Sequence, residues 1–161
     1  LMNNSGKIGE KLWANYLLDK GYDITNAPER RFYDWDLKAD KEGETITFEV
    51  KYDEKAYWWA ERRKTPNQPN LYIEFRNTSK AEDSGILASK SDYYIYIMKE
   101  DADMAYVFKR KELAELCQGS NFRVVGNAAT GDDNAEGWIP RLSDVVSNKN
   151  VFVMAISLSE K

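Results

Sequence analysis

The sequence predicts a single domain of the α/β or α+β class. Its 161 residues suit one domain and are enough to bury a sizeable core. Segments with the apolar–polar alternation of strands recur along the chain, and helical segments stand between them. No internal repeat, low-complexity tract or clear linker divides the sequence.

The chain opens with a predicted helix in "SGKIGEKLWANYLLDKGY". Ser5 is suited to cap its N-terminus, and Gly21 stands where the helix should end. The apolar stripe that would face the core is imperfect and consists of Ile8, Leu12, Ala14, Tyr16 and Leu17. The next segment, "DITNAP", is expected to form a short edge strand that ends at Pro28.

A β-hairpin is the clearest local structure in the sequence. The segment "FYDWDLKA" alternates so that Asp34 and Asp36 share one face, and "DKEG" provides the turn. The returning strand, "TITFEVKY", has an apolar face and a polar face, and the polar face carries Glu49 and Lys51. A hairpin centred near residue 42 places Asp36 roughly across from Phe48 and next to Glu49.

Further strands and short helices are expected after the hairpin. The stretch "DEKAYWWAERRKTPNQPN" predicts a short helix or a lid-like loop, with no regular element after Thr65. Strands are expected in "LYIEFRN", "DYYIYIMK" and "MAYVFKR", the last two as a hairpin around "EDAD". "SGILASKS" predicts a turn or short helix, and "RKELAELCQG" a helix that ends at Gly119. Residues 126–137 are expected to form a polar loop, and "WIPRLSDVV" and "VFVMAISL" follow it.

Composition excludes several kinds of chemistry. The chain has no histidine, so it can hold no His-based triad, His metal ligand or imidazole base. Cys117 is the single cysteine, which excludes a disulfide framework and a Cys-based zinc site. The net charge of −4 argues mildly against a large nucleic-acid surface but says nothing about local patches. No membrane-length apolar run and no apolar secretory region occur, so we expect a cytoplasmic protein without membrane contact.

The hairpin carries a candidate metal site for phosphodiester chemistry, although a solvated strand face is the plainer interpretation. Asp36 and Glu49 provide hard oxygen ligands of the kind that Mg²⁺ or Mn²⁺ prefers, and the carbonyl of Val50 is a further candidate. Lys51 is expected on the same side, where it would orient or deprotonate a water or neutralise phosphate charge. Asp34 competes with Asp36 for the ligand role, and Asp36 is preferred because its hairpin distance to Glu49 is shorter.

The pattern from Asp36 through twelve residues to Glu49-Val50-Lys51 resembles the Asp…(Asp/Glu)-x-Lys signature of the PD-(D/E)XK nuclease superfamily. The order of an opening helix, a strand with Asp and a strand with Glu-x-Lys is also that of the superfamily, while the literal Pro before the Asp is missing. The resemblance implies a restriction-endonuclease-like α/β fold, a mixed β-sheet flanked by helices in one domain over residues 1–161. It further implies Mg²⁺-dependent hydrolysis of DNA phosphodiester bonds, with Mn²⁺ as a substitute.

Two further segments resemble the Holliday-junction-resolvase and phage-type branch of this superfamily. A Glu in its first helix faces the metal, and Glu10 is the matching position. The stretch "NLYIEFRNTSKAEDSGILASKSDYYIYI" is similar to its strand, Ser-Gly-Ile turn and aromatic strand, which implies that Glu74 and Ser84 lie near the cleft. The late "GWIPRLSDV" is similar to the tail of such nucleases, so the likeness spans roughly residues 5–146. It implies a phage or mobile-element enzyme of recombination, repair or DNA degradation in a bacterial host, with a homodimer as one expectation.

Each of these positions also has a plainer interpretation. Glu10 is equally explained as a first-turn acid favoured by the helix dipole, and Glu74 as a solvated residue paired with Arg76 or with a neighbouring strand. Trp58 and Trp59 fit core or rim packing better than base stacking. The basic residues expected to contact DNA phosphates are Lys55, Arg62, Arg63 and Lys64, with the run 109–111 as a second candidate; solvated helix faces would explain both.

The competing interpretation of the whole chain is a non-catalytic nucleic-acid- or protein-binding module on the same scaffold. Intact Asp36, Glu49 and Lys51 argue against it, because a pure binder has no need of all three. A sequence-specific restriction-type enzyme remains open, since no base-reading element is identifiable. An RNA-directed nuclease ranks lower because no RNA-binding signature is present.

Overall fold

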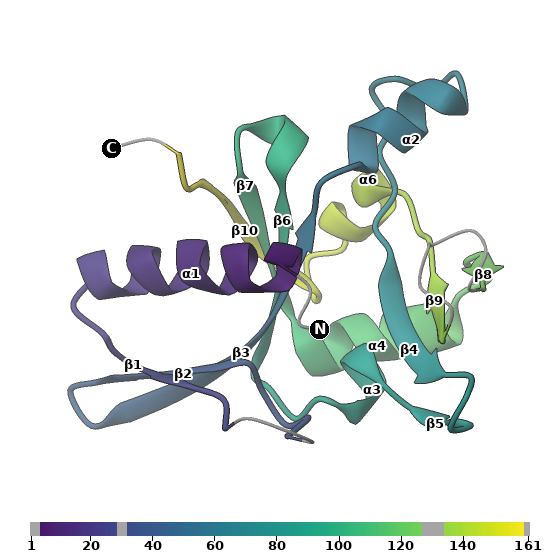
Figure 1. The fold of residues 1–161 in the computed structure, drawn as a ribbon. Helices are drawn as coiled ribbons and strands as arrows, with labels where there is room; N and C mark the ends of the chain where they lie inside the picture. Colours follow the sequence, from purple (N-terminus) through teal and green to yellow (C-terminus); the bar gives the residue numbers. More distant parts are fainter. Residues whose placement is uncertain (1–3, 29–31, 127–133, 160–161) are drawn as a thin grey trace.

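The computed structural model describes residues 4–28, 32–126 and 134–159. Within these ranges the chain is mixed α/β, with helices flanking a β-sheet that combines parallel and antiparallel strands (Figure 1). This agrees with the predicted class at that level. None of the helices in the described part has the length and apolar character needed to cross a membrane.

Six strands form the larger sheet, in the order β1-β2-β3-β6-β7-β10. Their bounds are Asp23–Asn26 (β1), Leu37–Lys41 (β2), Glu44–Asp53 (β3), Tyr93–Met98 (β6), Met104–Lys109 (β7) and Phe152–Ser157 (β10). The β3–β6 pair is parallel and the other neighbours are antiparallel. The expected edge strand and the hairpin of β6 with β7 are therefore confirmed, and the closing segment forms the strand β10.

A second, four-stranded sheet was not expected from the sequence. Its order is β5-β4-β9-β8, with β4 Ile73–Asn77, β5 Glu82–Asp83, β8 Val124–Val125 and β9 Ala135–Trp138. The predicted polar loop at 126–137 is wrong from Ala135 onwards, because β9 pairs with β4 there. Its residues 127–133 lie outside the described ranges.

Helices cover both faces of the six-stranded sheet (Figure 1). The helices of the described part are α1 Asn4–Asp19, α2 Ala56–Arg62, α3 Gly85–Ala88, α4 Arg110–Gly119 and α6 Leu142–Val146, with a 3₁₀ turn at Lys99–Asp101. Of these, α2 projects away from the sheet (Figure 1). Successive side chains of a strand point to opposite faces, and the core divides accordingly. Trp13 and Leu17 of α1 pack with Phe48, Val50 and neighbouring apolar residues on one face. The helices expected at the N-terminus and after β7 are confirmed.

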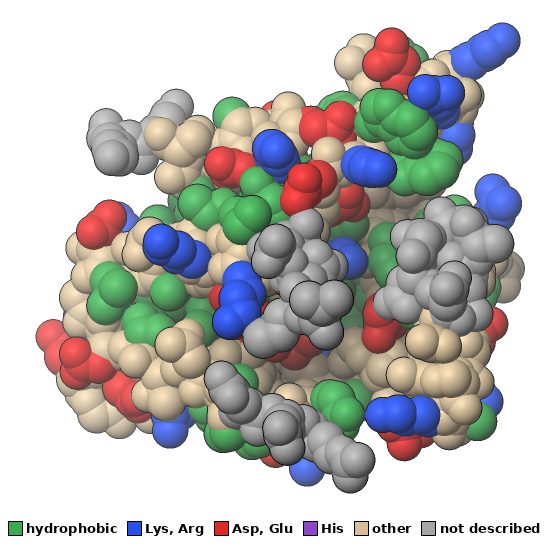
Figure 2. Space-filling model, viewed as in Figure 1, with side chains coloured by type: hydrophobic (Ala, Val, Ile, Leu, Met, Phe, Trp, Pro, Cys, Tyr) green, Lys and Arg blue, Asp and Glu red, His purple; other side chains and the backbone are tan. Residues whose placement is uncertain are grey.

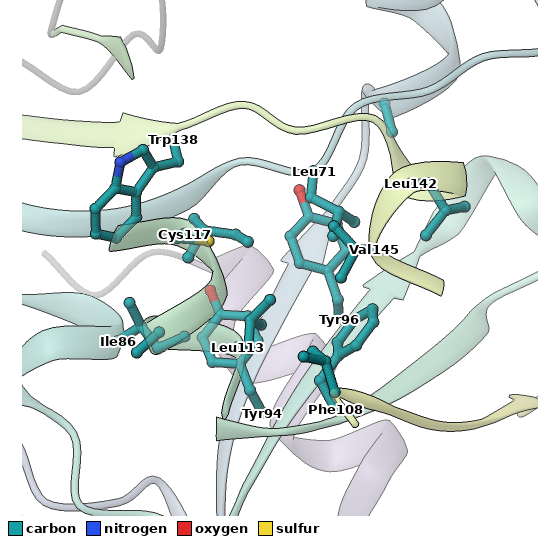
Figure 3. Packing of buried hydrophobic residues seen from close by; sticks show 14 of the residues in the cluster. Leu71, Ile86, Tyr94, Tyr96, Phe108, Leu113, Cys117, Trp138, Leu142 and Val145 are labelled. Atoms are coloured by element: carbon teal, nitrogen blue, oxygen red, sulfur yellow. The ribbon is translucent and has the colours of Figure 1, made fainter. Parts of the chain in front are cut away.

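The opposite face carries the second core cluster (Figure 3). Tyr94 and Tyr96 of β6 point into it, while Ile95 and Ile97 of the same strand belong to the α1 side. Elements α3, α4, α6 and β9 close over this face, and among them Leu113 and Cys117 are almost fully buried. Cys117 is therefore a buried small hydrophobe, and burial raises the pKa of its thiol to about 12.

The hairpin of β2 and β3 differs from the prediction in start and register. Residues 32–36 are irregular, and the first strand begins only at Leu37, which lies opposite Phe48. Glu42 and Gly43 both have positive φ, 53° and 81°, so they form a two-residue turn of the I′ kind. The hairpin therefore centres between residues 42 and 43. This register ends at Leu37, because the Asp36 N–H also bonds to the carbonyl of Phe48, the residue that the prediction placed roughly across from Asp36.

Candidate active site

The centre of the candidate site is the middle of β3. Val50 is buried under α1, so the alternation of the strand places Glu49 and Lys51 on the other face. Glu49 is partly buried on this second face, beside β6 and the α3 region. The expected split between an apolar and a polar side of the strand is confirmed.

Asp36 is joined directly to this strand. Its backbone N–H donates at 2.8 Å to the carbonyl of Phe48, the residue that is paired with Leu37, so the regular ladder ends here. The Asp36 Oδ2 accepts the N–H of Val50 at 2.8 Å. The carboxylate thus takes the place of a backbone carbonyl from a neighbouring strand. Because N–H and C=O of one strand residue point toward the same edge, the Val50 carbonyl faces the Asp36 side as well.

The Glu49 carboxyl has a pKa raised well above its ordinary value. Burial is the largest cause, followed by the negative charge of Asp36, and Glu10 and Glu74 add to it. The Ser89 hydroxyl interacts with the carboxylate and opposes the shift. Burial also raises the pKa of Asp36, against the hydrogen bond from Val50. The negative charges of Asp36, Glu10 and Glu74 therefore all disfavour ionisation of the buried Glu49 carboxyl.

Glu10 reaches this region from α1. Burial, and then the charge of Asp36, raise its pKa to about 7, while Lys7 opposes the shift. Glu10 is the seventh residue of α1, which begins at Asn4, and no acid lies in the first turn of that helix. The interpretation of Glu10 as a first-turn acid is therefore wrong. Its neighbour Gly9 lies where a Cβ would come within 2.8 Å of Tyr52, so a small residue lets the helix approach β3 closely.

Glu74 comes from β4, on the side of the sheet opposite α1. Arg76 pairs with Glu136 at 3.8 Å, so the expected pairing of Arg76 with Glu74 is not what the structure has. Gly85 lies against the Glu74 backbone at φ 53°, and a Cβ there would come within 2.8 Å of the Glu74 carbonyl carbon. Ser84, just before α3, has a buried hydroxyl that finds no hydrogen-bond partner among the described residues.

The choice between Asp34 and Asp36 is clearer in the structure. The carbonyl of Asp34 accepts the Lys90 N–H at 2.7 Å and the Ser89 hydroxyl at 3.2 Å. These two hydrogen bonds to the Asp34 carbonyl hold the α3–β6 connection against the segment that precedes β2. The charge of Asp36, and not that of Asp34, raises the pKa of Glu49. Ser89 was missed in the sequence, because its approach depends on this long-range packing.

The donor set of Glu10, Asp36, Glu49 and Glu74 is chemically suited to a hard divalent cation. A cation would relieve the mutual repulsion that raises the pKa values of Glu10 and Glu49. As placed, however, no three Asp, Glu, His or Cys side chains in the described ranges are close enough together to hold a metal ion. The predicted Mg²⁺ site therefore stays a prediction.

Lys51 stands at one end of a cleft of about 570 Å³. Its Nζ lies 5.3 Å from the centroid of the Tyr72 ring, a cation–π contact. Asp36 and Glu49 do not line this cleft, so Lys51 is the link between the carboxylates and the open space. The further basic residues on its wall are Lys55, Arg63 and Arg123.

The predicted DNA-contacting residues are exposed on or beside α2, which confirms a short helix there. Lys55 and Arg63 line the cleft, whereas Arg62 and Lys64 do not. Arg62 lies over the Trp58 ring, 4.2 Å from its centroid. In the alternative run 109–111, Arg110 donates to the carbonyl of Ser91 at 2.8 Å and so has a structural contact. Arg123, which the sequence analysis missed, shares the cleft wall with Arg63.

Comparisons of the chain with protein-family models, with curated proteins and with solved structures gave no match. The functional inference therefore depends on the geometry of the site and on the resemblance of its short motif.

Proposed function

We propose that the protein is a metal-dependent deoxyribonuclease of the PD-(D/E)XK type with a restriction-endonuclease-like fold. The observation that carries the proposal is the hydrogen bond between Asp36 and Val50. It holds a carboxylate against the Glu49-Val50-Lys51 segment, so the three parts of the motif meet on one hairpin. The opening helix that brings Glu10 to the same acids supports the proposal independently.

In this proposal Asp36, Glu49, Glu10 and the carbonyl of Val50 hold Mg²⁺, for which Mn²⁺ substitutes. When bound, the ion stabilises charge on the phosphate and lowers the pKa of a water. Lys51 orients that water or contacts the phosphate from the cleft side, where its ammonium group lies over Tyr72. Glu74 and Ser84 border the site, and Ser89 positions Glu49 through its hydroxyl.

A role in phage or mobile-element recombination, repair or DNA degradation follows from the motif resemblance alone. The same holds for a place in the bacterial cytoplasm and for a homodimer. These finer assignments are part of the proposal. The DNA substrate preferred in the cleavage assay described next tests the first assignment, the role in recombination, repair or degradation.

The test is a cleavage assay with Mg²⁺ and with Mn²⁺ on single-stranded, linear duplex, flapped and four-way-junction DNA. Wild type is compared with Glu49→Gln and Lys51→Met. The matched control is Glu44→Gln, an exposed acid at the turn end of the same strand. We expect metal-dependent cutting that Glu44→Gln retains and the other two variants lose. Equal cutting by Glu49→Gln and wild type would exclude Glu49 from the chemistry.

A non-catalytic nucleic-acid-binding module is the second candidate. It is favoured by one observation, the lack of a ready three-ligand metal group in the part of the chain that the structure describes. This candidate predicts DNA binding that is indifferent to Mn²⁺, with no cutting of any of the four substrates. Metal-dependent cutting that Glu49→Gln abolishes would exclude it.

A further inference from the structure

Three arginines from separate segments lie near one another, and two of them, Arg63 and Arg123, line the same cleft as Lys51. Arg63 immediately follows α2, Arg123 immediately precedes β8, and Arg141 immediately precedes α6. Burial lowers the pKa of Arg63, and the positive charges of Arg141 and Arg123 lower it further. Arg123 and Arg141 are therefore close enough to Arg63 for their positive charges to act on its guanidinium group.

Backbone contacts fix the segments that carry these arginines. Ile139 donates its N–H to the carbonyl of Arg123 at 2.9 Å, and Asn70 forms a bridge with Arg141. Arg63 itself reaches back to the carbonyl of Gln68, 3.4 Å away. The cluster is thus assembled by the second sheet and its connections, which places like charges together before any ligand arrives.

In the part of the chain that the structure describes, no ion pair gives this cluster a counter-charge. Within the described ranges the ion pairs join Arg76 to Glu136 and Lys99 to Glu54, and none includes Arg63, Arg123 or Arg141. Guanidinium groups are suited to phosphate oxygens, which they bind with directed pairs of hydrogen bonds. A phosphate group would therefore both satisfy these donors and relieve their repulsion.

The charge balance of the cleft points in the same direction. The acidic residues on its wall, Asp53 and Glu54, already have partners. Asp53 accepts hydrogen bonds from the Tyr96 hydroxyl and the Lys55 N–H, and Glu54 pairs with Lys99 at 3.8 Å. The basic side of the wall consists of Lys51, Lys55, Arg63 and Arg123. The cleft is thus locally positive on a chain whose net charge is −4.

An aromatic side chain stands beside these cations. Trp59 lines the cleft and keeps 46% of its surface exposed, and basic and hydrophobic side chains gather over α2 in Figure 2. A positive groove with an exposed aromatic ring suits unpaired bases, because a base in a duplex has its faces covered by its neighbours. The volume of about 570 Å³ is that of a small-ligand pocket, which admits a short length of one strand and not a double helix.

We propose that this cleft binds an unpaired segment of a DNA strand, with a phosphate on Arg63 and Arg123 and a base against Trp59. Arg141 adds positive charge behind Arg63. A strand held in this way runs toward Lys51 and delivers an adjacent phosphodiester bond to the carboxylates. The choice of DNA and the direction of the strand rest on the proposed nuclease function; the binding itself requires no metal.

The experiment measures binding by fluorescence anisotropy in EDTA, with short labelled single-stranded DNA, blunt duplex DNA and single-stranded RNA of the same sequence. We expect the single-stranded DNA to bind at least ~10-fold more tightly than the duplex, because stacking contributes about 1–3 kcal/mol per base. Trp59→Ala should weaken this binding about 10-fold. The double variant Arg63→Gln/Arg123→Gln should weaken it and reduce the salt slope by about 0.7, the contribution of the one phosphate that the two arginines share on a single strand.

Lys149→Gln is the matched control, an exposed cation outside the cleft wall, and thermal melts check that every variant folds. Equal affinity for single strand and duplex, or a double arginine variant that binds like Lys149→Gln, would overturn the proposal. Tighter binding of RNA would overturn the choice of DNA. Metal-dependent cutting without any single-strand preference would contradict the single-strand binding site but support the nuclease function. Tight single-strand binding without cutting would support the single-strand binding site but contradict the nuclease function.

Discussion

The backbone N–H of Val50 donates a 2.8 Å hydrogen bond to Oδ2 of Asp36. Asp36 lies just before β2, so its side chain takes the role that a further strand residue would have in the ladder. The contact makes the position of the carboxylate depend on the register of the hairpin. A structural hydrogen bond and a proposed metal ligand are therefore combined in one side chain, and two substitutions can separate them.

Asp36→Asn and Asp36→Ala should differ in stability but not in activity. Asn keeps an oxygen acceptor for the Val50 N–H, whereas Ala leaves that donor without a partner at a cost of about 1–3 kcal/mol. Both variants lack the charged ligand, so we expect cutting to fall at least ~10²-fold in each. Urea denaturation in EDTA and the cleavage assay measure the two effects. An Asn variant that cuts like wild type would show that Asp36 is only structural.

The acids of the site should make the fold less stable as pH rises. The pKa of Glu10 is raised from 4.5 to about 7, so the folded state holds a proton that the unfolded state has already lost between these values. Its stabilising effect is complete below pH 4.5 and is lost as pH rises through about 7. Glu49, whose pKa is raised well above its ordinary value, acts in the same direction.

Glu10→Gln should therefore stabilise the protein at pH 8 and have little effect at pH 4. The shift corresponds to roughly 3 kcal/mol at ~1.36 kcal/mol per pH unit. Because the side chain is partly exposed, we expect about 1–2 kcal/mol after solvent screening. Urea denaturation in EDTA across this pH range measures the difference, with Glu44→Gln as the control. A difference that does not change with pH would contradict the raised pKa.

Mn²⁺ should raise the melting temperature of wild type at pH 8. A ligand present at about 100 times its Kd stabilises the folded state by ~2.7 kcal/mol. For a chain of this size that corresponds to roughly 5–10 °C. The effect should be smaller at pH 6, where Glu10 is mostly protonated, and absent in Glu49→Gln. Calorimetry with and without Mn²⁺ measures it, and an equal rise in Glu49→Gln would place the ion elsewhere.

The sequence predicted the parts of the site that depend on local pattern. The alternation in β3 places Val50 on one face of the strand and Glu49 and Lys51 on the other. A two-residue turn at 42–43 determines which residues of β2 pair with which residues of β3. The register of the regular β2–β3 pairs differs by one position from the predicted one, because the turn centre lies between two residues, whereas Asp36 bonds to Phe48 as predicted. Pairing on either side of a short turn is set by nearest neighbours, and for that reason a pattern in one sequence can predict it.

The parts that the sequence did not predict depend on contacts between distant segments. Ser89 approaches Glu49 only because the α3–β6 connection is tied to Asp34. Arg123 and Arg63 share a wall because β8 and β9 form a second sheet, and the composition of residues 126–137 suggested a loop. Such contacts have no periodic signature, and isolated charged residues are common on any surface.

Gly85→Ala should destabilise the protein more than Gly43→Ala. Both glycines have positive φ, 53° and 81°, which costs about 1 kcal/mol for any other residue. A Cβ at Gly43 meets nothing within 4 Å, whereas one at Gly85 comes within 2.8 Å of the Glu74 carbonyl carbon and closer to its oxygen. Overpacking against backbone adds roughly 2 kcal/mol for Gly85→Ala only.

The same pair of variants tests whether the position of Glu74 matters for the site. Gly85→Ala displaces the β4 backbone at Glu74, and Glu74 is one of the charges that raise the pKa of Glu49. We expect Gly85→Ala to lower cutting at a temperature where it is still folded, while Gly43→Ala cuts like wild type. Equal loss of stability in the two variants would show that the β4 backbone shifts at this contact without a cost in free energy. Unchanged cutting by a destabilised Gly85→Ala would show that Glu74 lies outside the catalytic geometry.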